Sequence, residues 1–246
     1  MKLTLDVENT VTHRGGKLHL DPFESDNKLV MVGCLTDGNE ETLFRDTFDG
    51  VQEILDEATI LIGHNIVHDL LWLWECGFKY DGAVFDTMLV EYVLQCGNKQ
   101  PLSLEACANR YELETKKQDT MKEYFKNKVP IDEIPKQELA DYLTADLKAT
   151  QELSDVLYKK LNTKEYSGLM NTVVLTNRVA VTLARIYQNG FTVDVTKLNE
   201  VRDEFEKEKA ETEKRLTKQV TNLMGDTPIN LNSPEQMSWV IYSRKP

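Results

Sequence analysis

The sequence predicts an α/β fold, a mixed sheet flanked by helices, followed by a mostly α-helical segment. Strand-like segments come first, at residues 2–8, 28–36 and 40–45, and the turn Asp37-Gly38-Asn39 separates the last two. Consecutive strands joined by turns indicate an antiparallel start to the sheet. After residue 50, strand-like and helical segments alternate, which is typical of a mixed α/β sheet.

The alternating part ends in one long helix. We expect helices at 50–58, 67–77, 88–95 and 103–111, with strands at 59–65 and 82–87 between them. Turn-forming residues predict a loop at 15–27, and a polar connector is expected at 116–135. The long helix then runs from about Lys136 to Leu161.

The character of the chain changes near residue 162. Two long helices are expected, at 168–190, closed by Asn189-Gly190, and at 195–224, with a narrow apolar stripe. Residues 1–161 carry 17 Lys and Arg against 30 Asp and Glu, whereas residues 162–246 carry 12 against 11. We therefore predict two domains, 1–161 and 162–246.

The composition argues against several classes of protein. The net charge of −12 argues mildly against a protein that binds nucleic acid by bulk charge alone, although clustered metal-binding carboxylates also make a chain acidic. The four cysteines have no C-x-x-C spacing, so a thiolate metal site is not expected. The N-terminus lacks a secretory pattern and no stretch is long enough to span a membrane, so a cytoplasmic protein is expected.

The first strand carries two acids on one face. In LTLDVENTV (residues 3–11), Asp6 and Glu8 are two residues apart, and side chains at this spacing point to the same side of a strand. Adjacent carboxylates repel each other, and burying them unpaired costs several kcal/mol. Either this face is solvated, or a cation lies between the two acids.

Two further pairs of polar residues have helical spacing. Asn65 and Asp69 in GHNIVHDLLWL are four residues apart, as are Tyr142 and Asp146 in DYLTADLKAT. Each pair alone is compatible with an ordinary hydrogen bond on a helix surface. Asp69, however, stands beside a run of Leu and Trp, where an acid is unexpected. The ordered set D-x-E, N-x3-D and Y-x3-D is far more specific than any one pair.

This ordered set resembles the DEDD superfamily of 3′–5′ exonucleases, which has the ribonuclease H-like fold, and within it the tyrosine-bearing (DEDDy) class. The chain is most similar to the proofreading domain of family A DNA polymerases. Its three motifs read LDVENT, HNIVHD and YLTAD, and FDTMLVEYVL and LSLEACANRY resemble the segments between the second and third motifs. The resemblance covers residues 1 to about 161. His68 departs from it, because the second motif usually has Phe or Tyr there.

The resemblance implies a set of catalytic residues and two divalent cations, Mg²⁺ or Mn²⁺. Asp6 would bridge both ions, Glu8 and Asp146 would complete the shell of the first, and Asp69 would serve the second. Carboxylates without Cys or His suit such hard cations. Tyr142 would orient the attacking water, because an ordinary tyrosine with a pKa of about 10 is a poor base. Asn65 would hold the helix start or bind substrate.

The implied reaction removes nucleoside 5′-monophosphates from single-stranded or mismatched DNA 3′ ends. The stretch 110–128 mixes basic and aromatic residues and would suit contacts with the nucleic acid backbone and bases, although a solvated connector is the alternative. Its residues of interest are Arg110, Tyr111, Lys116, Lys117, Lys122, Tyr124, Phe125, Lys126 and Lys128.

The second part resembles the start of a family A polymerase domain, thumb-like and truncated, in NRVAVTLARIYQNGFTVDVTKL and INLNSPEQMSWVIYSRKP. The polymerase motifs with their catalytic aspartates do not follow. We therefore expect a piece of a longer polymerase or a natural split product, which does not polymerise alone and has the rest of the polymerase as a partner. The compact exonuclease-like half suggests a bacteriophage enzyme.

Three alternatives remain open from the sequence. An RNA-trimming exonuclease of the same superfamily would have the same metal site, although a polymerase-like tail favours DNA. A catalytically weak or inactive module that binds DNA would tolerate loss of the acids, which are all present. A structural α/β domain whose acids coincide by chance is the third alternative.

Overall fold

The structure is a computed structural model that describes residues 1–113 and 119–242. It divides into two compact units, Met1–Asn189 and Gly190–Pro246. The first compact unit therefore extends past residue 161, where the sequence placed the domain boundary. The added part of the unit is helix α7 (Met170–Asn189), which packs against α2 (Ile66–Glu75), α3 (Thr87–Leu94) and β7 (Ala83–Asp86). None of the helices in the described ranges is long and apolar enough to cross a bilayer.

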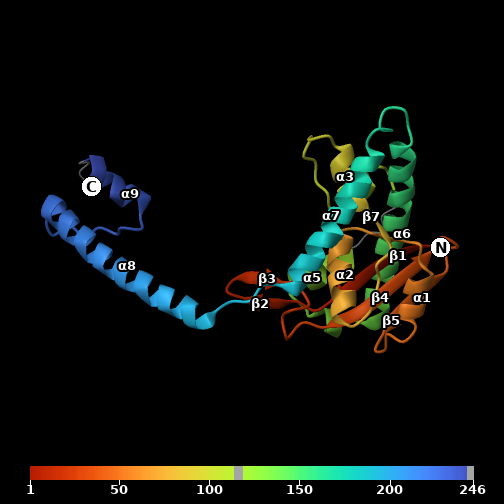
Figure 1. Cartoon of the computed structure of the whole chain (residues 1–246), viewed down its shortest axis with the longest axis horizontal. Helices are drawn as coiled ribbons and strands as arrows, with labels where there is room; N and C mark the ends of the chain where they lie inside the picture. Colours follow the sequence, from red (N-terminus) through yellow and green to blue (C-terminus); the bar gives the residue numbers. More distant parts are fainter. Residues whose placement is uncertain (114–118, 243–246) are drawn as a thin grey trace. The chain divides into compact units, whose positions relative to one another are not determined.

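The first unit is built on a mixed sheet with the order β5-β4-β1-β6-β7, of which Figure 1 labels β5, β4, β1 and β7. β1 pairs antiparallel with β4, and β4 with β5, whereas β1, β6 and β7 are parallel. The predicted mixed sheet with an antiparallel start is thus confirmed. The bounds are β1 Lys2–Asn9, β4 Leu29–Thr36, β5 Glu41–Arg45, β6 Ile60–Gly63 and β7 Ala83–Asp86.

A small hairpin occupies the first predicted loop. β2 (Thr12–Arg14) and β3 (Lys17–His19) pair antiparallel, so the loop predicted at 15–27 is wrong for residues 17–19. Gly15 and Gly16, both with positive φ, form the turn that joins the two strands. The strands are too short to show the alternation by which longer strands are recognised.

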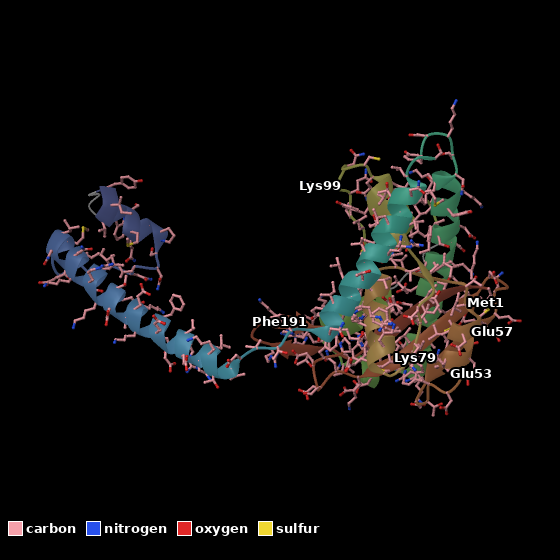
Figure 2. All side chains as sticks on the ribbon, viewed as in Figure 1. Met1, Glu53, Glu57, Lys79, Lys99 and Phe191 are labelled. Carbon is pink, nitrogen blue, oxygen red and sulfur yellow. The ribbon has the colours of Figure 1, made fainter. Side chains whose placement is uncertain are left out.

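The start of β1 is tied to the end of helix α1 (Val51–Glu57). The Met1 amino group donates to the carbonyl oxygen of Glu57 at 3.1 Å, and both residues lie at the same edge of the unit (Figure 2). Leu3, Leu5 and Val7 of β1 are buried in the core formed with α1 and α2 (Ile66–Glu75). The alternating residues of the strand therefore face away from this core.

Further helices complete the unit. They are α3 (Thr87–Leu94), α4 (Leu104–Arg110), α5 (Asp119–Lys126) and α6 (Lys136–Leu161), with a short 3-10 helix η1 (Ile131–Glu133) before α6. The bounds of α6 match the prediction. The connector predicted at 116–135 is wrong where α5 and η1 form, and its residues 116–118 lie outside the described part of the chain. Gly190–Pro246 contains α8 (Val195–Met224) and α9 (Pro234–Tyr242).

Helix α6 packs very closely on the sheet because β4 has a glycine beneath it. Gly33 pairs with Asp6 of β1, and a Cβ atom at Gly33 would lie 2.7 Å from Leu147 Cδ1 and 2.9 Å from Leu143 Cγ. Leu143 and Leu147 are fully buried in the core between α6 and β4. The missing side chain therefore sets the distance between α6 and the strand pair that carries Asp6.

We predict that Gly33→Ala destabilises the protein by about 1–3 kcal/mol, because the added methyl group overpacks the α6–β4 contact. Gly38→Ala is the matched control, since its Cβ would meet only Thr36 Oγ1 at 3.6 Å. The measurement is the free energy of unfolding from urea titrations. Equal stabilities for the two variants would contradict the close packing of α6 on Gly33.

Candidate active site

The first two candidate residues lie where β1 extends beyond its parallel neighbour. β1 pairs with β6 only at residues 2–4, whereas its pairing with β4 continues past Asp6 and Glu8. Asp6 is partly buried and Glu8 is 9% exposed. Both side chains lie on the face opposite Leu3, Leu5 and Val7, as their spacing predicts.

Asp69 joins this end of β1 from the first turn of α2. The backbone N–H of Val7, beyond the last residue that pairs with β6, donates to Asp69 Oδ1 at 2.9 Å. Asp69 is 2% exposed and belongs to the buried side of α2. Because β6 ends at Gly63 and α2 begins at Ile66, the short connection brings the start of this helix to the carboxyl end of β1.

Tyr142 and Asp146 reach the same place from α6. Both are partly buried and lie one helical turn apart, beside the buried row of Leu139, Leu143 and Leu147. The Tyr142 hydroxyl forms a side-chain hydrogen bond with Asp146. The structure thus brings together five predicted residues from three separate segments of the chain.

The carboxylates raise one another's pKa. Burial and the charge of Asp146 raise the pKa of Asp6 to about 7, and a side-chain hydrogen bond with Asp69 opposes this rise. The pKa of Asp69 is raised mainly by burial and next by the charge of Asp6. The pKa of Glu8 is raised by burial and by the charges of Asp6 and Asp146. Burial and mutual repulsion thus disfavour the fully ionised cluster, and a proton or a cation would relieve that repulsion.

The donor set suits a hard divalent cation. Its four carboxylates offer only oxygen atoms, which Mg²⁺ and Mn²⁺ prefer. Within residues 1–113 and 119–242, no group of three or more His, Cys, Asp or Glu side chains is arranged so that it could hold a metal ion as it stands. The carboxylates are instead near enough to shift one another's pKa, and a cation would reverse those shifts.

Asn65 does not hold the start of α2 with its side chain. It occupies the N-cap position in the left-handed conformation, with φ of 65°, and its side chain forms no capping hydrogen bond. The capping group is Asp86, whose carboxylate accepts from the N–H groups of Asn65 at 3.0 Å and Ile66 at 3.1 Å. Asp86 was not among the predicted residues, although an acid directly before a helical segment is a known capping pattern. The exposed Asn65 side chain remains a candidate for binding substrate.

His68 links the first two motifs. Its Nε2 donates to Asn9 Oδ1 at 2.8 Å, and Asn9 directly follows Glu8 at an irregularity in the β1–β4 pairing. The Asn9 amide nitrogen in turn donates to the carbonyl oxygens of Thr10 and Leu20. Burial lowers the pKa of His68, which favours the neutral ring. The imidazole at this departure from the family pattern therefore packs and hydrogen-bonds within the fold.

Several residues of the basic stretch 110–128 form ion pairs and hydrogen bonds within the protein. Arg110 pairs with buried Glu91 at 2.6 Å, and Lys122 pairs with Glu105 at 2.8 Å. Tyr111 and Tyr124 hydrogen-bond to Glu91 and Glu138, and Lys116 and Lys117 lie outside the described residues. Phe125 is different, because it is 46% exposed and packs edge-on against the ring of Tyr142 at 6.2 Å between centroids.

The comparison with protein families agrees with this geometry. Residues 14–162, more than half of the chain, match the family model of the 3′–5′ exonuclease domain of family A DNA polymerases. The chain belongs to this 3′–5′ exonuclease family. The match begins after Asp6 and Glu8, so the first motif rests on the structure and on its own pattern.

Named relatives point to the same family. The chain is 24% identical over 173 residues to DNA polymerase I of Bacillus subtilis, a match that covers 70% of this chain and 18% of that protein. The solved POL domain of Pol1 from M. smegmatis in complex with DNA primer-template and dNTP matches with a TM-score of 0.65 at 17% identity. It covers 98% of this chain and 37% of that one. The chain thus spans well under half the length of either relative.

A smaller nuclease also shares the fold. Brucella melitensis NrnC with bound Mg²⁺ matches with a TM-score of 0.57 at 17% identity, over 79% of this chain and 89% of that one. Both structural likenesses concern the fold alone, and they agree with the predicted mixed sheet flanked by helices of a ribonuclease H-like fold.

We predict that Asp6→Asn stabilises the cation-free protein by about 1 kcal/mol at pH 8, because it removes a charge from the cluster. The pKa of Asp6 is about 7 in the folded protein and 3.8 in the unfolded chain, so at pH 8 the ionised carboxylate destabilises the folded state. This destabilisation decreases as the pH falls from 7 toward 3.8, because the folded protein then takes up a proton at Asp6. The gain over wild type should therefore shrink between pH 8 and pH 5. Urea unfolding in EDTA measures it.

The exposed acid Asp49 provides the control for this experiment. Asp49→Asn should leave stability unchanged within about 0.5 kcal/mol at both pH values. A stability gain for Asp6→Asn that is absent, or that does not vary with pH, would contradict the mutual repulsion of the carboxylates.

Proposed function

We propose that the first unit is a metal-dependent 3′–5′ exonuclease that removes nucleoside 5′-monophosphates from single-stranded or mismatched DNA 3′ ends. The observation that carries this proposal is the convergence of Asp6, Glu8, Asp69, Asp146 and Tyr142 at the end of β1. These acids come from three separate segments, and their charges act on one another strongly enough to shift their pKa values. A chance arrangement of surface acids would not bury them together.

The carboxylates would hold two divalent cations, Mg²⁺ or Mn²⁺. When bound, these ions supply the positive charge that an attacking water and a leaving 3′ oxygen require. Asp6 is central, because it interacts with Asp146, Glu8 and Asp69. The Val7 N–H group fixes the orientation of Asp69 toward this centre.

Tyr142 would position the attacking water. Burial, then the charges of Asp146 and Glu8, raise its pKa far above the ordinary value, so the hydroxyl stays protonated at neutral pH. Because the hydroxyl proton is donated to Asp146, the hydroxyl oxygen can accept a hydrogen bond from a water and hold that water in line with the phosphorus atom, but a protonated phenol is too weak a base to remove its proton. The edge of Phe125 supports the ring of Tyr142, and the exposed part of Phe125 would offer a stacking surface to a base.

The relatives support DNA as the substrate and a larger polymerase as the natural context. B. subtilis DNA polymerase I is a polymerase by name, and the M. smegmatis structure contains DNA primer-template. The Brucella NrnC structure contains bound Mg²⁺. We therefore assign the exonuclease to the first unit, which contains residues 1–161 and α7, and Gly190–Pro246 to the helical start of a polymerase domain, with the rest of a polymerase as a partner.

We predict that the chain shortens a 5′-labelled single-stranded DNA oligomer from its 3′ end in the presence of Mg²⁺ or Mn²⁺. Asp6→Ala and Asp146→Ala should abolish the product ladder, because each removes an acid from the centre of the cluster. EDTA should have the same effect. Asp49→Ala, an exposed acid away from the cluster, is the matched control and should keep wild-type activity.

The same assay separates the alternatives. A ladder from an RNA oligomer that exceeds the DNA ladder would favour an RNA-trimming exonuclease. The absence of any ladder with either metal, together with binding of the labelled DNA, would favour a binding module. Activity retained in Asp6→Ala would contradict the proposed site.

We predict that Tyr142→Phe lowers kcat about 100-fold, because a misplaced nucleophile slows reaction to this extent. Binding of Mn²⁺ should persist, since the four carboxylates are unchanged. Tyr124→Phe is the control, because its hydroxyl bonds to Glu138 and not to the cluster. Single-turnover cleavage rates measure the effect, and equal rates for the two variants would exclude Tyr142 from water positioning.

A further inference from the structure

Asp86 holds the starts of two helices with one carboxylate. It is 1% exposed and lies at the end of β7, directly before α3. Its oxygens accept from Asn65 and Ile66 at the start of α2, and from Met88 at 2.9 Å and Leu89 at 3.3 Å at the start of α3. N-terminal helix amides and a carboxylate form strong, charge-assisted hydrogen bonds.

The same carboxylate controls where α2 begins, and α2 carries Asp69 in its first turn. Asn65 is held in a left-handed conformation, which an asparagine adopts at some cost and which the two bonds to Asp86 stabilise. Asp86 is also close enough for its charge to raise the pKa of Asp69. A change in Asp86 should therefore alter the position of Asp69 at the end of β1.

Asp86 is in turn fixed from α7. The Asn177 side chain is 4% exposed, accepts from the backbone N–H of Asp86 at 2.8 Å through Oδ1, and donates to the carbonyl oxygen of Val173 at 2.9 Å. Both ends of this amide are thus bonded inside the protein. Figure 1 shows α7 running beside α2, and the two helices are in contact.

Helix α7 begins after residue 162, where the match to the exonuclease family ends. Hydrogen bonds nevertheless link α7 to the cluster through the backbone of Asp86 and the first turn of α2. These bonds run from Asn177 to Asp86, from Asp86 to the first amides of α2, and from Asp69 on α2 to the Val7 N–H group.

We propose that Asn177 and Asp86 are positioning residues of the exonuclease site, so that α7 is a working part of the exonuclease rather than only the start of the next domain. This inference rests on the proposed function. Neither residue touches the reacting atoms. Each acts by fixing the first turn of α2, and hence the Asp69 carboxylate, against β1.

The activity test compares Asn177→Ala and Asp86→Asn with two controls in the full chain. Asn171→Ala removes an exposed asparagine from the same helix, and Ser103→Ala removes the cap of α4, where Ser103 Oγ accepts from Ala106 at 3.3 Å. We expect both test variants to lower kcat on single-stranded DNA with Mn²⁺ about 10-fold, without a change in KM. Both controls should keep the wild-type kcat.

The double variant tests the order of these links. If Asn177 acts through Asp86, combining Asn177→Ala with Asp86→Asn should lower kcat no further than Asp86→Asn alone. Multiplied losses would show that the two residues act independently and would overturn the proposed link.

Hydrogen exchange provides a readout without substrate. Asn177→Ala should speed amide exchange at Asn65 and Ile66, relative to Asn171→Ala, and leave the amides of α4 unchanged. Equal acceleration in α2 and α4, or none, would overturn the inference, as would wild-type kcat in both test variants. If the wild-type chain cleaves no DNA, the proposed function fails, and the exchange result alone decides whether Asn177 positions α2.

Discussion

Repulsion between buried carboxylates is the constraint on which the first unit depends. Asp6, Glu8, Asp69 and Asp146 meet at the end of β1, although their charges disfavour one another. Like charges in a site of low dielectric separate unless the rest of the fold prevents it. The packing of α6 on β4 and the Val7–Asp69 hydrogen bond prevent this separation. The cluster therefore stores unfavourable energy that a cation can release, which is common at functional sites.

The two sides of the cluster are held by different means. On one side, apolar packing holds α6 in place, because Leu143 and Leu147 fill the space above Gly33. Gly33 is the residue of β4 that pairs with Asp6. On the other side, hydrogen bonds hold α2 in place, since the backbone N–H groups of Asn65 and Ile66 at its start donate to the Asp86 carboxylate. Core packing tolerates small displacements poorly. Close packing and paired hydrogen bonds are the kinds of support that a site holding several charges in a fixed arrangement requires.

Periodicity predicted the sheet and the long helix Lys136–Leu161, because these follow from side-chain spacing along single elements. The five residues that converge were predicted from the resemblance of the three ordered motifs to the exonuclease family. The structure places those five residues together, whereas their roles remain proposals. The supports could not be predicted in the same way. The need for glycine at position 33 depends on the leucines of α6 that pack above it, which the sequence around Gly33 does not show. Asn177 is 91 residues from its partner Asp86, so no local pattern links the two. The hairpin strands and α5 were missed because short elements show too few periods of their pattern.

The most direct test of the cluster as a cation site is the location of bound Mn²⁺ by anomalous diffraction from crystals of the chain without nucleic acid. We expect anomalous density beside Asp6, with carboxylate oxygens of Asp6, Glu8 and Asp146 about 2.0–2.2 Å away. We also expect loss of that density in Asp6→Asn. Anomalous density confined to other surface acids, with Asp6 still hydrogen-bonded to Asp69, would contradict a cation-binding role for the cluster.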